Sequence, residues 1–322
     1  MYKMKISVIA IFYNSEKYCK KCIDSILSQK GNFELEIIAV NDCSTDNTVQ
    51  ILNSYTDNRI KVIHHVHNQG ISAARNTGLK HISGDCFYFI DGDDYLPPKS
   101  LSTLSTHFSP EIDWVQGGYA KCDESGEVIN ISNNRTNTYN SFQSICENFN
   151  ELEFVYTHNR LIHSKWKHIK FPIGKAHEDR FWNISIFPHL TKISNVSDTT
   201  YNYVCHPQSF SNKSRASESY ILDGIELLEK MRNLSKCWQT TADLFQITAI
   251  EKNLYLFPYN KNFRTSVINQ LYLLPKVQLS TKGFPRYTNM IHYVIQKHYP
   301  DSIIHMISCI YRFYINTTKH PI

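Results

Sequence analysis

Phe87-Tyr88-Phe89-Ile90-Asp91-Gly92-Asp93-Asp94-Tyr95-Leu96-Pro97-Pro98 is an apolar run that ends in three carboxylates within four positions. Its aromatic and β-branched residues favour a buried strand, and the two prolines indicate that a turn follows. Carboxylates this close repel one another unless a hard divalent cation accepts their oxygens. The stretch therefore predicts a strand that carries a metal site at its exposed end. An acidic loop without a ligand is the alternative.

The composition indicates a globular protein without a disordered half, because hydrophobic residues make up 42% of the 322 positions and charged residues 20%. No apolar run reaches the roughly 18 residues that a membrane span needs, and the first predicted strand follows the N-terminus without a signal-peptide core. The nine cysteines are scattered and odd in number, which favours reduced thiols over a disulfide framework. These features predict a cytoplasmic protein.

The net charge of +5 is distributed unevenly along the chain. Residues 1–214 carry 21 Lys and Arg against 22 Asp and Glu, whereas residues 215–322 carry 13 against 7. Such a basic region attracts an anionic surface, and no Arg-rich or aromatic-interleaved nucleic-acid motif accompanies it. We therefore expect no nucleic-acid partner. We expect instead peripheral contact with the inner face of the cell membrane through the C-terminal region.

Predicted strands alternate with predicted helices in the first hundred residues. Apolar runs at 5–11, 35–40 and 60–65 precede the opening run, and residues with helix-capping ability or helical spacing separate them. This alternation predicts an α/β fold with a mainly parallel sheet and helices on both faces. Ligands of such sheets bind beyond the carboxyl ends of the strands.

Polar side chains follow each of these strand ends. They are Tyr13-Asn14, Asn41-Asp42, the turn before Arg75, and Asp91 to Asp94. The glycine-rich signatures of a nicotinamide-binding turn and of a P-loop are both absent from the sequence. Binding of a nucleotide through a metal ion, instead of by a glycine-rich loop, is an alternative that the sequence leaves open.

Five segments in order resemble glycosyltransferase family 2, whose members have the GT-A fold and transfer a sugar from a nucleotide-sugar with inversion. The segments are Ile6-Ser7-Val8-Ile9 with Tyr13-Asn14, Val40 to Thr48, Asn68 to Gly78, Phe89 to Asp94, and His177-Glu178-Asp179. The resemblance implies a GT-A, Rossmann-like catalytic domain at 1–215, with a nucleotide-sugar-binding half at 1–110 and an acceptor-side half at 111–215. Residues 216–322 are predicted to form a helical C-terminal region.

The resemblance also implies roles for residues at the first strand ends. Tyr13 would stack on the base beside Asn14, and Asp42 would hydrogen-bond the base. Arg75 would reach the nucleotide. The non-functional alternatives are an Asx turn for Asp42 and an exposed surface arginine for Arg75.

At the acidic strand end, the resemblance implies that Asp93 and Asp91 hold the nucleotide through Mn²⁺ or Mg²⁺. We favour Asp93 as the metal ligand, with Asp91 at the ribose or the metal and Gly92 in the same donor-binding loop. Asp94 is expected to brace that loop. A nucleoside diphosphate leaving group develops negative charge as the glycosidic bond breaks, and a divalent ion stabilises that charge directly.

Inverting transfer needs a carboxylate that takes the proton from the attacking hydroxyl. The resemblance places this base in the pair Glu178-Asp179, of which we choose Asp179, and a solvated helix-cap acid is the non-functional alternative. His206 and Ser209 lie in a segment that resembles the one closing over the donor diphosphate, where they would touch phosphate or metal. The family often has Arg at the position of Val204.

We therefore predict an inverting glycosyltransferase of bacterial surface-polysaccharide assembly. It would move a hexose or N-acetylhexosamine from a nucleotide-diphosphate sugar, with UDP favoured, to a hydroxyl of a glycan or lipid-linked glycan. A nucleotidyltransferase is an alternative, but residues 9–16 lack the expected phosphate-binding loop. A non-catalytic nucleotide- or sugar-binding scaffold is another, against which Asp93 and the candidate base argue. The apolar stretch 303–315 is expected either to lie at a membrane surface or to pack on protein.

Overall fold

The structure is a computed structural model. It describes residues 3–132, 135–148, 156–206, 218–232, 262–263 and 266–267. The chain forms two compact units, Met1–Gly174 with Glu178–Ser209, and Lys175–His177 with Phe210–Ile322. The stretch 303–315 lies outside the described residues.

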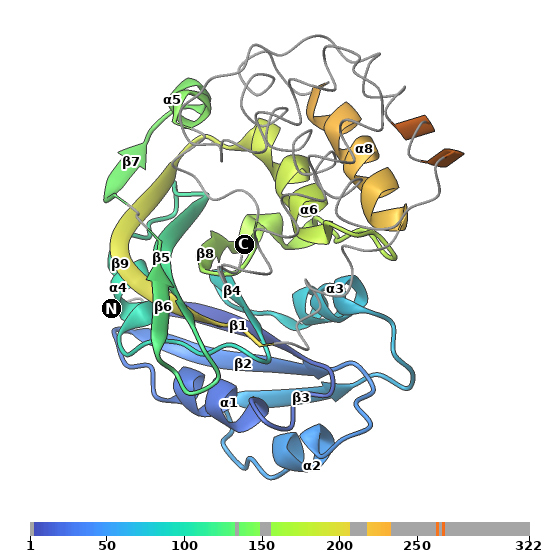
Figure 1. The fold of residues 1–322 in the computed structure, drawn as a ribbon. Coiled ribbons are helices and arrows are strands. Elements are labelled where there is room, and N and C mark those ends of the chain that lie inside the picture. The colour runs from blue at the N-terminus through green and yellow to red at the C-terminus, as the bar shows by residue number, and fades with distance from the viewer. Residues whose placement is uncertain are drawn as a thin grey trace. The chain divides into compact units, whose positions relative to one another are not determined.

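The first unit is built on one mixed sheet of nine strands (Figure 1). The strands are β1 (Met4–Phe12), β2 (Phe33–Asn41), β3 (Ile60–His64), β4 (Cys86–Asp91), β5 (Trp114–Cys122), β6 (Val128–Ile131), β7 (Asn137–Tyr139), β8 (Arg160–His163) and β9 (Ile193–Val204). Their order is β3-β2-β1-β4-β8-β5-β9-β7, and β6 pairs with β5 outside this path.

Strands β1 to β4 pair with one another in parallel, and antiparallel pairs involve the later strands. β1 pairs in parallel with β2 and β4, and β2 pairs in parallel with β3. β8 then runs antiparallel between β4 and β5, while β9 is again parallel to β5. The predicted α/β class with a Rossmann-like sheet is confirmed, and the antiparallel strands all follow residue 110.

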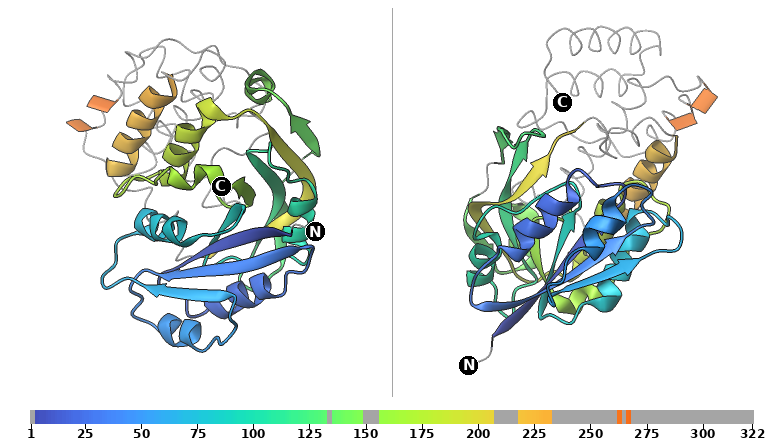
Figure 2. Two further views of the ribbon diagram at one scale, coloured as in Figure 1. Left: turned by 180° about the vertical axis from the view of Figure 1, so that it is seen from behind. Right: turned by 90° about the horizontal axis from the view of Figure 1, so that it is seen from below.

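Helices flank the sheet on both faces (Figure 2). They are α1 (Cys19–Leu27), α2 (Thr48–Asn53), α3 (Ile71–His81), α4 (Ser100–Thr106), α5 (Phe142–Glu147) and α6 (Glu178–Ile186), with short 3-10 turns η2 (Ser164–His168) and η3 (Phe187–His189). Strands covered on both faces have almost continuous apolar sequences, which is why the runs at 5–11 and 35–40 show little polar alternation.

The packing of α3 on β1 fixes one side of the site described below. Ile6, Val8, Ala10 and Phe12 of β1 belong to a core cluster that includes the buried side of α1. Ile9 packs against α3, where a Cβ on Gly78 would lie 2.3 Å from Ile9 Cγ2. Only glycine allows α3 to approach β1 this closely. The contact therefore sets the position of the site residues that α3 carries.

The second unit is described mainly by α8 (Glu218–Arg232). Ile221, Leu227 and Leu228 of this helix are fully buried. Lys175 Nζ lies 2.8 Å from Asp223 Oδ1 within the same unit. Among the described helices, none has the length and apolar character to span a membrane.

Candidate functional site

The three carboxylates after β4 lie in different surroundings. Asp94 is 2% exposed and accepts hydrogen bonds from the Tyr201 hydroxyl at 2.5 Å and the Val204 N–H at 2.7 Å. Burial and the neighbouring carboxylates raise the pKa of Asp94 well above its ordinary value. Asp94 therefore ties the acidic loop to β9, and both of its carboxylate oxygens are engaged by protein donors.

Asp91 and Asp93 keep part of their carboxylates in solvent, with side-chain exposures of 26% and 31%. His206 Nε2 lies 2.9 Å from Asp93 Oδ2, and this hydrogen bond raises the pKa of His206. Gly92, between Asp91 and Asp93, lets the loop pass close to β1, because a Cβ at this position would lie 2.5 Å from the Ile11 carbonyl oxygen. Two half-open acids thus stand at the carboxyl end of β4.

These acids fit a divalent ion of a particular kind. Within the described part of the chain, no three His, Cys, Asp or Glu side chains converge in a cluster able to hold a metal by themselves. Mg²⁺ is usually held by one or two carboxylates together with substrate phosphates, and protein cages for it are uncommon. Asp93 and Asp91 therefore suit an ion whose remaining ligands are phosphate oxygens and water.

A cavity of about 210 Å³ opens beside Asp93. It is lined by Lys17, Tyr18, Lys21, Asp93, Asp94, Glu124 and Val204. Lys17 in the turn before α1 and Lys21 in its first turn bring two ammonium groups to a site that also contains a half-open carboxylate. The Tyr18 ring lies 5.0 Å from the His206 ring at its border. This combination of charges suits an anionic ligand that carries a metal ion.

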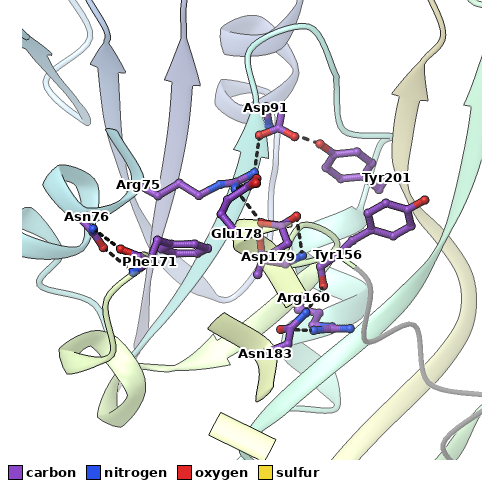
Figure 3. A network of polar contacts seen from close by, with 11 residues as sticks. Arg75, Asn76, Asp91, Tyr156, Arg160, Phe171, Glu178, Asp179, Asn183 and Tyr201 are labelled. Carbon is purple, nitrogen blue, oxygen red and sulfur yellow. Dashed lines mark hydrogen bonds and ion pairs between the residues drawn. The ribbon is translucent and has the colours of Figure 1, made fainter. Parts of the chain in front are cut away.

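The acids at the start of α6 are held by a buried arginine (Figure 3). Arg75 of α3 is 1% exposed. Its Nη1 lies 2.6 Å from Asp179 Oδ1 and 2.9 Å from Glu178 Oε1, and its Nη2 lies 3.1 Å from Asp91 Oδ1. One guanidinium thereby joins the acidic end of β4 to the acidic start of α6.

Asp179 has further hydrogen-bond partners in the segment before β8. The Thr157 hydroxyl donates to Asp179 Oδ1 at 2.8 Å, and the Thr157 N–H to Oδ2 at 3.4 Å. Burial and the charge of Asp179 raise the pKa of Glu178 to about 7. Near neutral pH a large part of Glu178 is therefore protonated, while Asp179 accepts the shorter bonds.

The ends of β1 and β2 carry a second group of predicted residues. Tyr13 is 51% exposed, so one face of its ring is open to a ligand. Asn14 has a φ of 49°, and its Oδ1 accepts a hydrogen bond of 2.8 Å from the Thr45 N–H. This bond ties the loop after β1 to the loop after β2.

Asp42 is buried, and its carboxylate is occupied by its own chain. It accepts hydrogen bonds from the N–H groups of Gln69 and Gly70 at 2.9 and 2.8 Å, and His65 Nδ1 lies 2.7 Å from Oδ1. These contacts hold the loop that precedes α3. Because its partners lie at positions 65–70, these contacts are not an Asx turn, and protein groups engage the Asp42 carboxylate instead of leaving it open.

The structure thus brings the predicted residues together as two groups at neighbouring strand ends. One contains Arg75, Asp91, Gly92, Asp93, Glu178, Asp179 and His206, and the other contains Tyr13, Asn14 and Asp42. Ser209 lies outside the described residues. Sequence reasoning missed Thr157, Lys17 and Lys21, which belong to no motif; a lysine pair one helical turn apart was the only available signal.

Comparisons with known proteins identify the family and the fold of the chain. Residues 7–168 match the model of glycosyl transferase family 2. Glycosyltransferase GlyA of Streptococcus pneumoniae serotype 4 is 31% identical over 223 residues, which are 64% of this chain and 31% of GlyA. The poly(ribitol-phosphate) beta-N-acetylglucosaminyltransferase TarS of Staphylococcus aureus is 28% identical over 62% of this chain and 35% of TarS. The matched part of the chain thus spans about a third of each relative.

Solved structures show the same fold. The crystal structure of S. aureus TarS 1–349 in complex with UDP-GlcNAc superposes with a TM-score of 0.65 at 21% identity, covering 96% of this chain and 92% of that chain. The mannosyltransferase PcManGT of Pyrobaculum calidifontis, in complex with GDP-Man and Mn²⁺, gives 0.52 at 16% identity, covering 85% and 86%. Because the family model covers half of the sequence, the chain belongs to glycosyltransferase family 2, and it has the GT-A fold.

Proposed function

We propose that the protein is a metal-assisted inverting transferase that moves a sugar from a nucleotide-diphosphate sugar to a glycan hydroxyl, with Asp179 as the base. The observation that carries this proposal is the sharing of Arg75 between Asp91 and Asp179. It links a half-open acid pair, suited to a metal and a diphosphate, to a buried acid that is oriented by two donors. Inverting transfer needs this pairing of a leaving-group site and a proton acceptor.

The donor is a UDP-sugar, most readily a UDP-hexose or UDP-N-acetylhexosamine. The cavity beside Asp93 supplies Lys17 and Lys21 for the diphosphate, and the exposed ring of Tyr13 supplies a stacking face for the base. The relative TarS is named an N-acetylglucosaminyltransferase and has been solved with UDP-GlcNAc. These features support UDP-GlcNAc as the first donor to test.

In the chemical step, Asp179 takes the proton of the acceptor hydroxyl while the hydroxyl oxygen attacks the anomeric carbon. The bond from that carbon to the diphosphate breaks, and its electron pair leaves with the nucleoside diphosphate. Asp93 and Asp91 would hold Mn²⁺ or Mg²⁺, which supplies Lewis-acid stabilisation of the leaving charge when bound. Lys17, Lys21 and His206 add positive charge on the same side of the site.

The acceptor is a hydroxyl of a bacterial surface polysaccharide or of its lipid-linked precursor. The relative TarS is named a poly(ribitol-phosphate) transferase, which supports a polymeric acceptor. We further propose that residues 1–215 form the catalytic domain and that 216–322 form a helical region. The excess of 13 Lys and Arg over 7 Asp and Glu at 215–322 supports peripheral contact with the inner face of the cell membrane.

A donor panel tests the proposal. The full chain is incubated with UDP-, GDP- and dTDP-sugars, with and without Mn²⁺, and the released nucleoside diphosphate is measured. We expect metal-dependent release from one UDP-sugar. A chain that binds nucleotide but releases no diphosphate from any donor would support the non-catalytic scaffold instead, and one that neither binds nor releases would remove the donor assignment altogether.

A further inference from the structure

We infer that Arg75 is a positioning residue for the base, and that it couples Asp179 to the donor side of the site through Asp91. The inference rests on the proposed function, because it concerns the orientation of the proposed base. It differs from the role that family resemblance implies for this arginine, which is contact with the nucleotide. An arginine that is 1% exposed in the described structure is enclosed by protein groups and presents no face to a nucleotide.

The guanidinium is held in place from two sides. Its central carbon lies 5.2 Å from the centre of the Phe171 ring. Asn76, the next residue of α3, fixes the backbone of Phe171: its Nδ2 donates to the Phe171 carbonyl at 2.9 Å and its Oδ1 accepts from the Phe171 N–H at 2.8 Å (Figure 3). α3 therefore supplies both the arginine and the support for the ring against which it packs.

The planar fork of Arg75 makes three contacts that a lysine cannot reproduce. Nη1 serves Glu178 and Asp179 of α6, and Nη2 serves Asp91 of β4. An ammonium group is a compact point charge, and it reaches one or two of these carboxylates at hydrogen-bond distance. Nε has no hydrogen-bond partner among the described residues. The position of the guanidinium is thus set by the three acids and the ring.

These contacts decide which oxygen of Asp179 is left for chemistry. Oδ1 receives the two short hydrogen bonds, from Arg75 at 2.6 Å and from the Thr157 hydroxyl at 2.8 Å. Oδ2 receives a long contact of 3.4 Å from the Thr157 N–H. Oδ2 therefore retains the lone-pair capacity to take a proton, and Arg75 with Thr157 holds it in one orientation.

The charges of these groups explain why Arg75 also couples Asp179 to the donor side of the site. Three carboxylates share one guanidinium, and burial beside Asp179 raises the pKa of Glu178 to about 7, so that one proton offsets part of the excess negative charge. Asp91 remains 26% exposed at the end of β4, two residues before Asp93, which lines the donor cavity. A ligand that binds Asp91 changes the hydrogen bond between Asp91 and Arg75 Nη2. Because the same guanidinium bonds Asp179, the change also affects Asp179. By linkage, a change at Asp179 acts equally on Asp91.

The test compares two buried arginines. Arg75→Lys and Arg75→Met are measured beside Arg160→Lys; Arg160 is also 1% exposed, but it bonds Gln116 and Asn183. The readouts are UDP affinity by calorimetry with Mn²⁺, steady-state UDP release from the UDP-sugar selected by the donor panel, and the dependence of that release on pH. Thermal unfolding of each variant defines the temperature at which all are folded.

We expect Arg75→Met to lower kcat for UDP release about 100-fold while UDP affinity changes by less than about 3-fold. Its pH–rate profile should shift toward higher pH, because the base has lost its cation. Arg75→Lys should fold well and recover about 10-fold of the loss. Arg160→Lys should lower the unfolding temperature and leave kcat and the pH profile unchanged.

Three results would overturn the inference. A loss of UDP affinity of about 10-fold or more in Arg75→Lys makes the arginine a nucleotide ligand. An unchanged kcat and pH profile in folded Arg75→Lys and Arg75→Met makes it purely structural. Equal losses of kcat in Arg75→Lys and Arg160→Lys indicate general damage. Absence of UDP release from the native chain is a different failure, because it refutes the proposed function and the inference with it.

Discussion

The acids that follow β4 and the acids that begin α6 are the same kinds of side chain in opposite surroundings. The Asp93 side chain is 31% exposed and bonds a histidine, His206. Asp179 is 14% exposed in its side chain and bonds a permanent cation, Arg75, together with Thr157. At the end of β4, Asp93 keeps oxygen surface open to a cation supplied from outside, although Asp91 there already bonds Arg75. At the start of α6 the protein provides the positive charge itself, through Arg75.

This difference separates two tasks that one acidic cluster could not perform together. A carboxylate that is to bind a metal and a diphosphate must keep open oxygens and tolerate an arriving cation. A carboxylate that is to accept a proton must be oriented before the acceptor arrives and must not be captured by the metal. Arg75 lies between the two groups and gives them this division. Substitutions in the two groups should therefore affect different quantities: turnover at α6 and metal dependence at β4.

The largest effect is expected at the base. Asp179→Asn keeps the shape of the side chain but removes the proton acceptor, so that UDP release from a UDP-sugar should fall about 1,000-fold. UDP binding with Mn²⁺, measured by calorimetry, should stay within about 3-fold of the native value, because Asp179 reaches the metal side only indirectly, through Arg75. An Asp179→Asn enzyme with native turnover would move the base to another residue, and Glu178→Gln is the first variant to examine in that case.

A smaller but distinct loss is expected at the metal side. Asp93→Asn removes one negative charge from the end of β4, and the Mn²⁺ concentration needed for half-maximal UDP binding should rise about 100-fold. High Mn²⁺ should restore part of the activity, whereas it should not restore Asp179→Asn. Asp198→Asn, at an exposed position of β9, is the matched control and should leave the Mn²⁺ dependence unchanged. A similar shift in that control would point to a general charge effect.

The smallest effect concerns stability and its dependence on pH. The folded pKa of Glu178, about 7, exceeds its ordinary value of 4.5, so this group's contribution to stability is present below pH 4.5 and is lost as pH rises through 7. Glu178→Gln resembles the protonated form and should keep that contribution. At pH 8 the variant should unfold roughly 6–12 °C above the native protein, a gain of about 3 kcal/mol, and at pH 5 close to it.

Differential scanning calorimetry across this pH range checks the prediction, with Glu34→Gln, an exposed acid of β2, as control. If both variants respond alike, or if Glu178→Gln is less stable than the native protein at pH 8, the proton does not reside on Glu178.

Local sequence features were sufficient to predict the sheet and the placement of its strand ends. The runs at 5–11 and 35–40 form β1 and β2, because parallel strands buried on both faces need continuous apolar sequence, and the run at 60–65 forms the edge strand β3. The glycine and prolines around Asp91 to Asp94 marked the loop correctly. The polar residues at these ends then had to meet at one edge of the sheet, since parallel strands share their direction.

The contacts among those residues could not be predicted in the same way. Arg75 and Asp179 lie 104 positions apart, and their contact depends on how α6 approaches α3. Thr157 belongs to no motif and reaches Asp179 through the segment before β8. Asp42 followed a strand end as expected, but only the path of the loop at 68–70 shows that its oxygens are occupied. Such pairings arise from tertiary packing, which local patterns do not encode.

The hydrogen bonds from Tyr201 and Val204 to Asp94 also have a consequence for how the protein is made. These bonds join positions 107 and 110 residues apart. During synthesis, strands β1 to β4 can pair long before β9 leaves the ribosome, but the Asp94 carboxyl then lacks the donors that hold it in the native chain. Closing such long loops is slow. The acidic loop at 91–94 is synthesised early, but it therefore reaches its native form only after residue 204 has been translated.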